Sequence, residues 1–253
     1  MGRRIAVVIL ALSALMPLVL LGLWSVGDHW FFPTLIPPAF TTDSWRATLT
    51  GRLGAAALIS GVVALATAVL GCAFAMPIGR AMARLSGWRR HMASALAFLP
   101  VAAPPIALGL GLQYAFVTLG VSGTIVGVIA AHVVSATSFL AIYFAGVFTA
   151  LDPRIEDEAR CLGARPLDVW TRITIPIVRR QIGDALALGF LVSWAQVPLT
   201  LVIGGGIVRT LPLEVYDYLR AGETRYAATG ALLLTVPPML ALLAARRERV
   251  APL

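Results

Sequence analysis

The 253-residue sequence contains no lysine, and all of its basic side chains apart from three histidines are arginines. A phosphate-binding P-loop requires a lysine that reaches the nucleotide phosphates, so this chain does not hold a Walker A site. If ATP drives the protein, a separate subunit must hydrolyse it. The net charge of +8 would suit nucleic acid, but the distribution of the arginines assigns them to membrane topology. We therefore expect no nucleic-acid partner.

Cysteine and histidine are also scarce. Cys72 lies in an apolar run and Cys161 in a charged segment, so the two cysteines give no disulfide framework. The three histidines, His29, His91 and His132, are far apart in the sequence, and no zinc-ligand spacing occurs. We expect no metal site, no cofactor and no catalytic residue, and the role of His132 stays open.

Charge as a whole is low. Charged residues make up 13% of the chain and hydrophobic residues 59%, whereas a soluble domain carries about 25% charged residues. This composition indicates a membrane protein, and the length suits a single membrane domain spanning residues 1–253. A spanning helix needs about 20 mostly apolar residues. Six segments meet this requirement: 5–26, 53–79, 94–118, 124–148, 182–203 and 227–245.

The arginines predict which side of the membrane each segment faces. The first apolar run is longer than the core of a signal peptide, so we interpret it as an uncleaved first helix. With the N-terminus in the cytoplasm, fifteen of the twenty arginines fall in cytoplasmic segments. This positive-inside bias predicts that both termini are cytoplasmic. The five remaining arginines are Arg46, Arg52, Arg209, Arg220 and Arg225.

The most polar part of the chain is the segment 152–176, which lies between two of the predicted spans. Asp152 can cap a helix that Pro153 begins. Gly163 supplies a stop that tolerates a positive φ, and Pro166 begins a second helix. The segment therefore predicts two short helices joined at a bend, in the cytoplasm.

The first of these helices carries Ile155, Ala159 and Leu162 at the i, i+4, i+7 spacing of one apolar stripe. An exposed charged helix with an apolar stripe is suited to docking into a socket of another protein. An ordinary solvated loop between two membrane helices is the alternative, and spacing alone leaves both open.

The segment 152–176 resembles the EAA loop of the membrane subunits of bacterial ATP-binding-cassette (ABC) importers. That pattern is Glu-Ala-Ala, three residues, Gly, nine residues, Ile, one residue and Leu-Pro. The sequence departs from it with Asp for Glu, Glu for the first Ala and Ile for Leu, and whether the larger Glu158 alters coupling stays open. The resemblance implies that the following residues contact an ATPase: Asp157, Glu158, Ala159, Gly163, Ile173 and Pro176.

Two further stretches are similar to polyamine-type and iron-type permeases of this class. Three prolines between 100 and 105 precede a Gly-Leu-Gly in the third predicted span and favour a broken or kinked helix there. In the fifth predicted span, Ser193, Gln196 and Thr200 are spaced i, i+3, i+7 and would share one helical face. We interpret them as candidates for the translocation path; hydrogen bonds to neighbouring helices are the alternative.

The resemblance implies an all-α membrane protein of six transmembrane helices with a MetI-like type I ABC importer permease fold, in the bacterial inner (plasma) membrane. It implies two ATP-binding cassette ATPase subunits, a second permease subunit, identical or different, and an extracytoplasmic solute-binding protein. A short outer helix after residue 204 would receive that binding protein. The chain itself would be a permease subunit and not an enzyme.

The solute predicted first is of the spermidine and putrescine type. Ferric iron, thiamine or a phosphonate are alternatives within transport. A membrane scaffold or an intramembrane enzyme are alternatives of another class. The sequence has neither an HExxH nor a GxSxG motif, and His132 has no evident acidic partner, which disfavours an enzyme.

Overall fold

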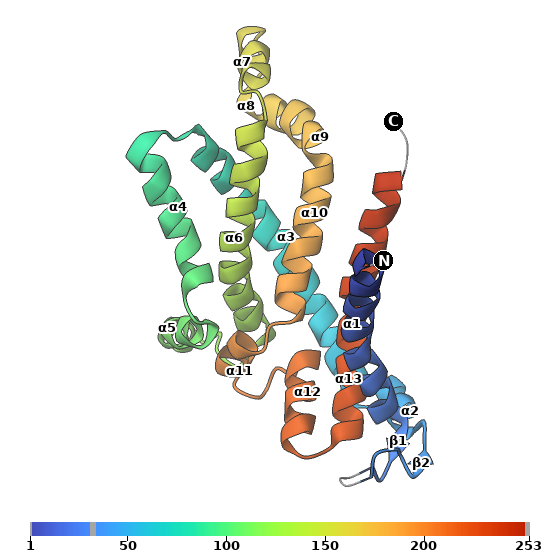
Figure 1. Cartoon of the computed structure of the whole chain (residues 1–253). Coiled ribbons are helices and arrows are strands. Elements are labelled where there is room, and N and C mark those ends of the chain that lie inside the picture. Colours follow the sequence, from blue (N-terminus) through green and yellow to red (C-terminus); the bar gives the residue numbers. More distant parts are fainter. Residues whose placement is uncertain (1, 31–33, 251–253) are drawn as a thin grey trace. The chain divides into compact units, whose positions relative to one another are not determined.

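The computed structural model describes residues 2–30 and 34–250, and within them it is helical apart from one short pair of strands (Figure 1). The chain divides into two compact units. Unit 1 holds Met1–Gly61 and Arg209–Leu253, and unit 2 holds Val62–Val208. The helical content agrees with the predicted all-α class.

Unit 1 is built around the C-terminal helix α13, which contacts α1, α2 and α12. Strands β1 and β2 pair in antiparallel fashion, with Gly27 opposite Phe40 and Asp28 opposite Ala39. Helix α12 is the short helix that the sequence predicts after residue 204; its Glu214 is buried between Arg52 and Arg209. The elements of this unit are α1 (Gly2–Val26), β1 (Gly27–Asp28), β2 (Ala39–Phe40), α2 (Asp43–Thr50), the first residues of α3 (Arg52–Arg84), α12 (Leu211–Arg220) and α13 (Thr224–Val250).

Unit 2 holds the remainder of α3 and a set of helices in which α6 contacts α4, α10 and α11 (Figure 1). Its core is apolar and contains Cys72, Met76, Leu140, Phe144 and Val178. Its further elements are α4 (Gly87–Ala102), α5 (Pro105–Thr118), α6 (Ile125–Ala150), α7 (Arg154–Cys161), α8 (Pro166–Asp168), the π-helical turn η1 (Val169–Thr174), α9 (Ile175–Ile177), α10 (Arg179–Trp194) and α11 (Pro198–Gly204).

Helices α3 and α6 approach each other closely at Gly79. A Cβ built on Gly79 would lie 2.5 Å from the Cβ of Phe144 and 2.8 Å from the backbone oxygen of Ala141. Only a residue without a side chain fits there. Small residues at helix contacts are characteristic of membrane helices, where packing rather than hydrophobic exclusion of water drives association.

Two predicted spans are each divided into two helices. The span 94–118 breaks between α4 and α5, which are bent by 96°, and this confirms the break expected from its prolines. The residue before Pro104 is extended, as proline requires of its predecessor. The span 182–203 breaks between α10 and α11, with a bend of 64°. The continuous helix expected over 182–203 is therefore wrong.

Helices α3 and α6 are long and apolar enough to cross a membrane, and two further crossings result if each bent pair counts as one. Residues Leu15–Val26 of α1 form a shorter apolar helix. These counts concern the described residues. Six spans, and the boundaries given above for them, stay a prediction.

Candidate functional site

The polar segment 152–176, called the coupling segment below, has the local structure that its sequence predicts. The Asp152 carboxylate accepts a hydrogen bond of 3.0 Å from the backbone N–H of Arg154, where α7 begins. Gly163 follows α7 with a φ of +89°, a conformation that a side chain would strain. Pro166 then begins α8, and the chain continues through η1 and α9 into α10. The predicted pair of short helices with a glycine bend is confirmed.

Three apolar residues of this segment are exposed. Leu162 is 90% exposed, Leu167 72% and Ile155 40%. Exposed apolar side chains on a short charged helix are a feature of surfaces that another protein covers. The rest of the described chain does not cover these three side chains.

The six residues matched to the EAA pattern are distributed along the same segment. Asp157, Glu158, Gly163 and Pro176 are exposed, whereas Ala159 and Ile173 are half-buried. The Asp157 carboxylate lies 2.8 Å from Arg160, three residues further along α7. None of the six residues is fully buried.

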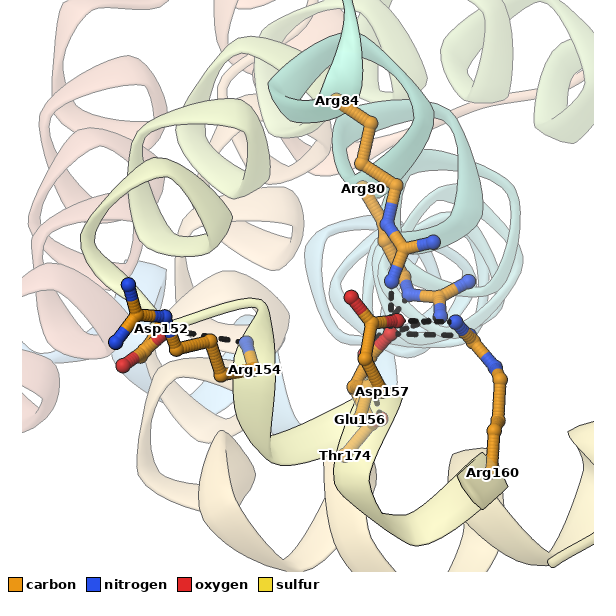
Figure 2. Close-up of polar contacts among 8 residues, drawn as sticks. All are labelled: Arg80, Arg84, Asp152, Arg154, Glu156, Asp157, Arg160 and Thr174. Carbon is orange, nitrogen blue, oxygen red and sulfur yellow. Dashed lines mark hydrogen bonds and ion pairs between the residues drawn. The ribbon is translucent and has the colours of Figure 1, made fainter.

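The residue that anchors the segment was missed by the sequence reasoning. Glu156 is only 3% exposed, and its carboxylate is surrounded by donors (Figure 2). Arg80 donates from Nε to Oε1 at 3.0 Å. The Nη2 groups of Arg80 and Arg84 also contact Oε2, and Arg160 Nη2 lies 3.3 Å from it. Thr174 donates its hydroxyl to Oε1 at 2.9 Å. These five residues are called the Glu156 cluster.

The electrostatic balance keeps Glu156 ionised. Burial by itself would raise the pKa of Glu156, but hydrogen bonds from Arg80 and Thr174 and the charges of Arg80 and Arg84 outweigh burial, so the pKa lies below its ordinary value. The cluster joins α7 and η1 to the end of α3. Because the buried charge is paired and hydrogen-bonded, it holds these elements together without an unpaired ion.

An aromatic contact extends this connection to α6. The Arg80 guanidinium lies over the ring of Trp170, 5.1 Å from its centroid. Trp170 in turn stacks on Phe148 at a centroid distance of 6.4 Å. The coupling segment is therefore fixed to α3 and α6 by its inner side, while its outer side stays exposed.

Two features of the sequence point to the Glu156 cluster. Arg80 and Arg84 are spaced i, i+4 at the end of a membrane helix, so they share a face on which one anion can meet both. Glu156 is also the first of three consecutive acidic residues, 156–158, near the start of α7, where negative charge favours a helix. Which of the three turns inward depends on contacts with residues more than 70 positions away, and no local pattern contains that information.

The candidate path residues do not share a helical face. Ser193 lies in α10, Gln196 lies between the helices, and Thr200 lies in α11. The shared face assumed one continuous helix, and that assumption fails at the 64° bend. Pro198 accounts for it, because a proline inside a helix clashes with the carbonyl four residues earlier, here that of Trp194.

A buried histidine brings two of these residues together. His132 in α6 is 2% exposed, Ser193 5% and Thr200 0%. The Ser193 hydroxyl lies 2.8 Å from His132 Nδ1, and the Thr200 hydroxyl lies 3.0 Å from Nε2. Gln196 is half-buried at the break. His132, Ser193 and Thr200 are called the His132 cluster. Within the described part of the chain, no three His, Cys, Asp or Glu side chains are grouped to hold a metal ion.

Comparisons with known proteins identify the family. Residues 75–247 match the model of the binding-protein-dependent transport system inner membrane component. The chain is 30% identical to the molybdenum transport system permease protein ModB of Mycobacterium tuberculosis, over 79% of this chain and 81% of that protein. PhnV of Salmonella typhimurium, named provisionally as a 2-aminoethylphosphonate transport system permease protein, is 26% identical over 98% of this chain and 92% of its own length.

The putrescine transport system permease protein PotI of Escherichia coli is 28% identical, over 67% of this chain and 62% of that protein. These relatives are transport permeases and not enzymes, and their named solutes differ from one another. The family match covers most of the chain and includes the coupling segment and both helix breaks. The chain therefore belongs to the binding-protein-dependent transport system inner membrane components, the multi-pass permeases of type I ABC importers.

Proposed function

We propose that this permease subunit is driven through its coupling segment, which docks into a cleft of an ABC ATPase. The observation that carries the proposal is the division of α7 into two sides. Its Glu156 side is buried and anchored to α3, while Leu162 and Ile155 are exposed. A segment held on one side and apolar on the other transmits a displacement of a bound partner to the membrane helices.

The family match supports the remaining partners. Two ATPase subunits close on ATP, the coupling segments of two permease subunits move with them, and the pathway opens outward to receive solute from a binding protein. The arginine distribution supports a cytoplasmic location of the coupling segment and of both termini. Asp157, Glu158, Ala159, Gly163, Ile173 and Pro176 would form the ATPase contact.

The chain offers a direct test of docking. Cys161 is exposed on α7, whereas Cys72 is buried. In a Cys72→Ala background, Cys161 carries a water-soluble linker with a maleimide at one end and an amine-reactive ester at the other. Because the chain has no lysine, the ester cannot be consumed by a lysine of the same subunit. We expect a covalent product with the ATPase subunit in the assembled transporter.

A matched control moves the cysteine to the outer side. Cys161→Ser combined with Ala221→Cys places an exposed thiol after α12, where the topology predicts the extracytoplasmic face. This variant should give no ATPase product and should react with an impermeant thiol reagent added to spheroplasts. An ATPase product from position 221, or none from position 161 in an assembled complex, would refute the proposed docking and orientation.

We also propose that the break between α10 and α11 faces the translocation route. Gln196 is the candidate whose side chain is half-buried, whereas the hydroxyls of Ser193 and Thr200 bond to His132. An amide would contact a solute by hydrogen bonds and not by an ion pair. Single cysteines at positions 193, 196 and 200, in a background without Cys72 and Cys161, are to be labelled with a water-soluble thiol reagent in each nucleotide state. Position 196 should react in at least one state, and equal protection at all three positions would place the route elsewhere.

Two classes of solute are supported by different observations. A putrescine-type cation is supported by the sequence resemblance and by the similarity to PotI. An oxyanion or phosphonate is supported by the similarity to ModB and PhnV and by the composition of the membrane helices of unit 2. Among α3, α4, α5, α6, α10 and α11, the sequence has one carboxylate, Asp184, which is exposed and lies 3.5 Å from the hydroxyl of Tyr143.

Ligand retention by the cognate binding protein separates the two classes. Calorimetric titration of that protein with putrescine, molybdate and 2-aminoethylphosphonate should give saturable binding with one class only. Uptake into proteoliposomes that contain the whole transporter should follow the same preference. Putrescine binding would favour the polyamine class, and binding of either anion would exclude it.

A further inference from the structure

The His132 cluster forms a directed chain of hydrogen bonds across the break between α10 and α11. The Thr200 hydroxyl donates to the backbone oxygen of Gln196 at 3.1 Å. It therefore accepts from His132 Nε2–H, and His132 Nδ1 accepts from the Ser193 hydroxyl. With this assignment every polar group of the imidazole is satisfied. One side chain of α6 thus bonds to the last turn of α10 and to the first turn of α11.

The other end of α11 is held separately. The backbone N–H of Gly123 donates to the oxygen of Ile203 at 2.8 Å. On the α5 side, a Cβ built on Gly109 would lie 3.2 Å from Val202, so α5 and α11 are in close contact. Helix α11 is therefore fixed at its C-terminal end by the chain before α6 and along its side by α5. At its N-terminal end, Leu199 packs against α5, 3.4 Å from a Cβ built on Gly109, and Thr200 bonds to α6 through His132.

The break also lies on the direct connection from the coupling segment. The coupling segment ends at Pro176, Val178 is buried, and α10 begins at Arg179 and runs without interruption to Trp194. A displacement of the coupling segment reaches the break through α10. A bend of 64° between two short helices would absorb that displacement if nothing held it. Three residues, 195–197, separate α10 from α11, and a short connection between two helices is a natural hinge.

We infer that His132 is a positioning residue that locks this bend, so that α10 and α11 move as one body with α6 when the transporter changes state. The inference rests on the proposed function, because it assigns a purpose to the lock in transmitting movement from the coupling segment. His132 does not act by touching the solute in this state, since it is 2% exposed and both ring nitrogens are occupied by hydroxyls of the protein.

The first test measures the bend directly. Spin labels are placed at Ala187 of α10 and Leu201 of α11, both exposed, in the complete transporter without Cys72 and Cys161. Labelled subunits are diluted with unlabelled ones, and the distance distribution is measured by pulsed electron resonance without nucleotide and in an ATP-trapped state. We expect a single narrow distance distribution with the same mean distance in both states. A shift between the two states in the parent protein would overturn the one-body movement.

The substitution His132→Leu removes both hydrogen bonds and keeps a side chain of similar size. Two hydrogen bonds of average strength in a membrane interior correspond to about an eightfold change in an equilibrium constant. We therefore expect a broadened distribution with a second, less bent population. Solute imported per ATP hydrolysed should fall severalfold, while ATP hydrolysis continues. An unchanged distribution in His132→Leu would overturn the inference.

Three further single variants keep the test decisive if His132→Leu does not assemble, and one double variant sharpens it if it does. Ser193→Ala and Thr200→Val each remove one hydrogen bond and leave the histidine in place. Each should broaden the distance distribution less than His132→Leu does. His132→Gln restores a donor and an acceptor and should narrow it again, a rescue that a merely space-filling residue would not give. Ser193→Ala added to His132→Leu should have no further effect. If the parent transporter shows no import or no product from Cys161 while the distributions respond as expected, the proposed function fails and the lock stands.

Discussion

The Glu156 cluster and the His132 cluster perform similar mechanical tasks in unit 2 with different chemistry. The first holds a short helix to the end of α3 by a buried carboxylate that three arginines and a threonine contact. The second holds two helices across a break by a histidine and two hydroxyls, none of which is a carboxylate or an arginine. Both clusters join segments that are far apart in the sequence.

The difference follows from where each cluster lies. The Glu156 cluster is at the end of a membrane helix, and its arginines reach solvent, with Arg84 42% exposed at its side chain. Charges there keep part of their hydration. The His132 cluster lies within the helices of unit 2 and is almost completely buried, where an ion would lose its hydration at a large free-energy cost. The same kind of joint is therefore charged near water and neutral inside the membrane domain.

Glu156→Ala should have the largest effect. It leaves Arg80 and Arg84 without their anion, and removing one partner of a buried ion pair destabilises by about 3 kcal/mol or more. We expect a lower thermal stability of the purified transporter and loss of ATPase co-purification. Glu156→Gln keeps the size and a hydrogen-bond acceptor, so its thermal stability should lie between those of the parent and Glu156→Ala. Equal stability of the parent and Glu156→Ala would mean that the cluster is not an anchor.

Two threonines test the comparison most directly. Thr174 donates to a charged carboxylate, and Thr200 bonds to neutral partners; both are fully buried. Hydrogen bonds to charged groups contribute about 1.5–3 kcal/mol, whereas those in membrane interiors average about 0.6 kcal/mol. Thr174→Val should therefore lower the free energy of unfolding more than twice as much as Thr200→Val. The reverse order would contradict the distinction between the two clusters.

Gly163→Val tests whether the shape of the coupling segment matters apart from its charges. A side chain at a positive φ costs about 1–2 kcal/mol, and nothing lies within 4 Å of a Cβ at this position, so strain is the sole local effect. Uptake should fall while the subunit still reaches the membrane. The measurement is solute uptake per subunit, with ATPase co-purification alongside.

Two glycines serve as matched controls for this variant. Gly87 also has a positive φ of +56° and open space, but it lies outside the coupling segment. Gly183 lies in α10 with open space and no positive φ. Gly87→Val should lower stability without the same loss of coupling, and Gly183→Val should change both little. Equal uptake in all three variants would show that Gly163 has no special part in docking.

Acid should weaken the Glu156 cluster over a narrow pH range. We expect this effect on stability to be smaller than those of the substitutions above. The pKa of Glu156 is lowered in the folded protein from an ordinary value of 4.5. A lowered pKa contributes stability that is fully present above pH 4.5 and is lost as the pH falls through the folded-state pKa. The difference in thermal stability between the parent and Glu156→Gln should be constant from about pH 8 to 5 and shrink below. A difference that grows on acidification would have the wrong sign.

Local signals account for the parts of the structure that the sequence predicted. Asp152, Gly163 and Pro166 act on neighbouring residues, and each has its expected place at a helix start, a bend and a second start. The break before Pro105 was expected for the same reason. Pro198 indicates a helix break in the same way, but the apolar run over 182–203 obscured it. A long apolar run shows that a segment can span a membrane and does not show that the segment is one continuous helix.

Sequence alone determined that this chain is a membrane protein and that its polar segment folds into two short helices. Composition, the absence of lysine and short-range turn chemistry are properties of the chain in any fold. Tertiary structure decided which carboxylate is buried and what His132 bonds to. Glu156 meets Arg80 across 76 positions and His132 meets Thr200 across 68. Such pairings depend on how helices pack, and packing brings together residues that no local pattern relates.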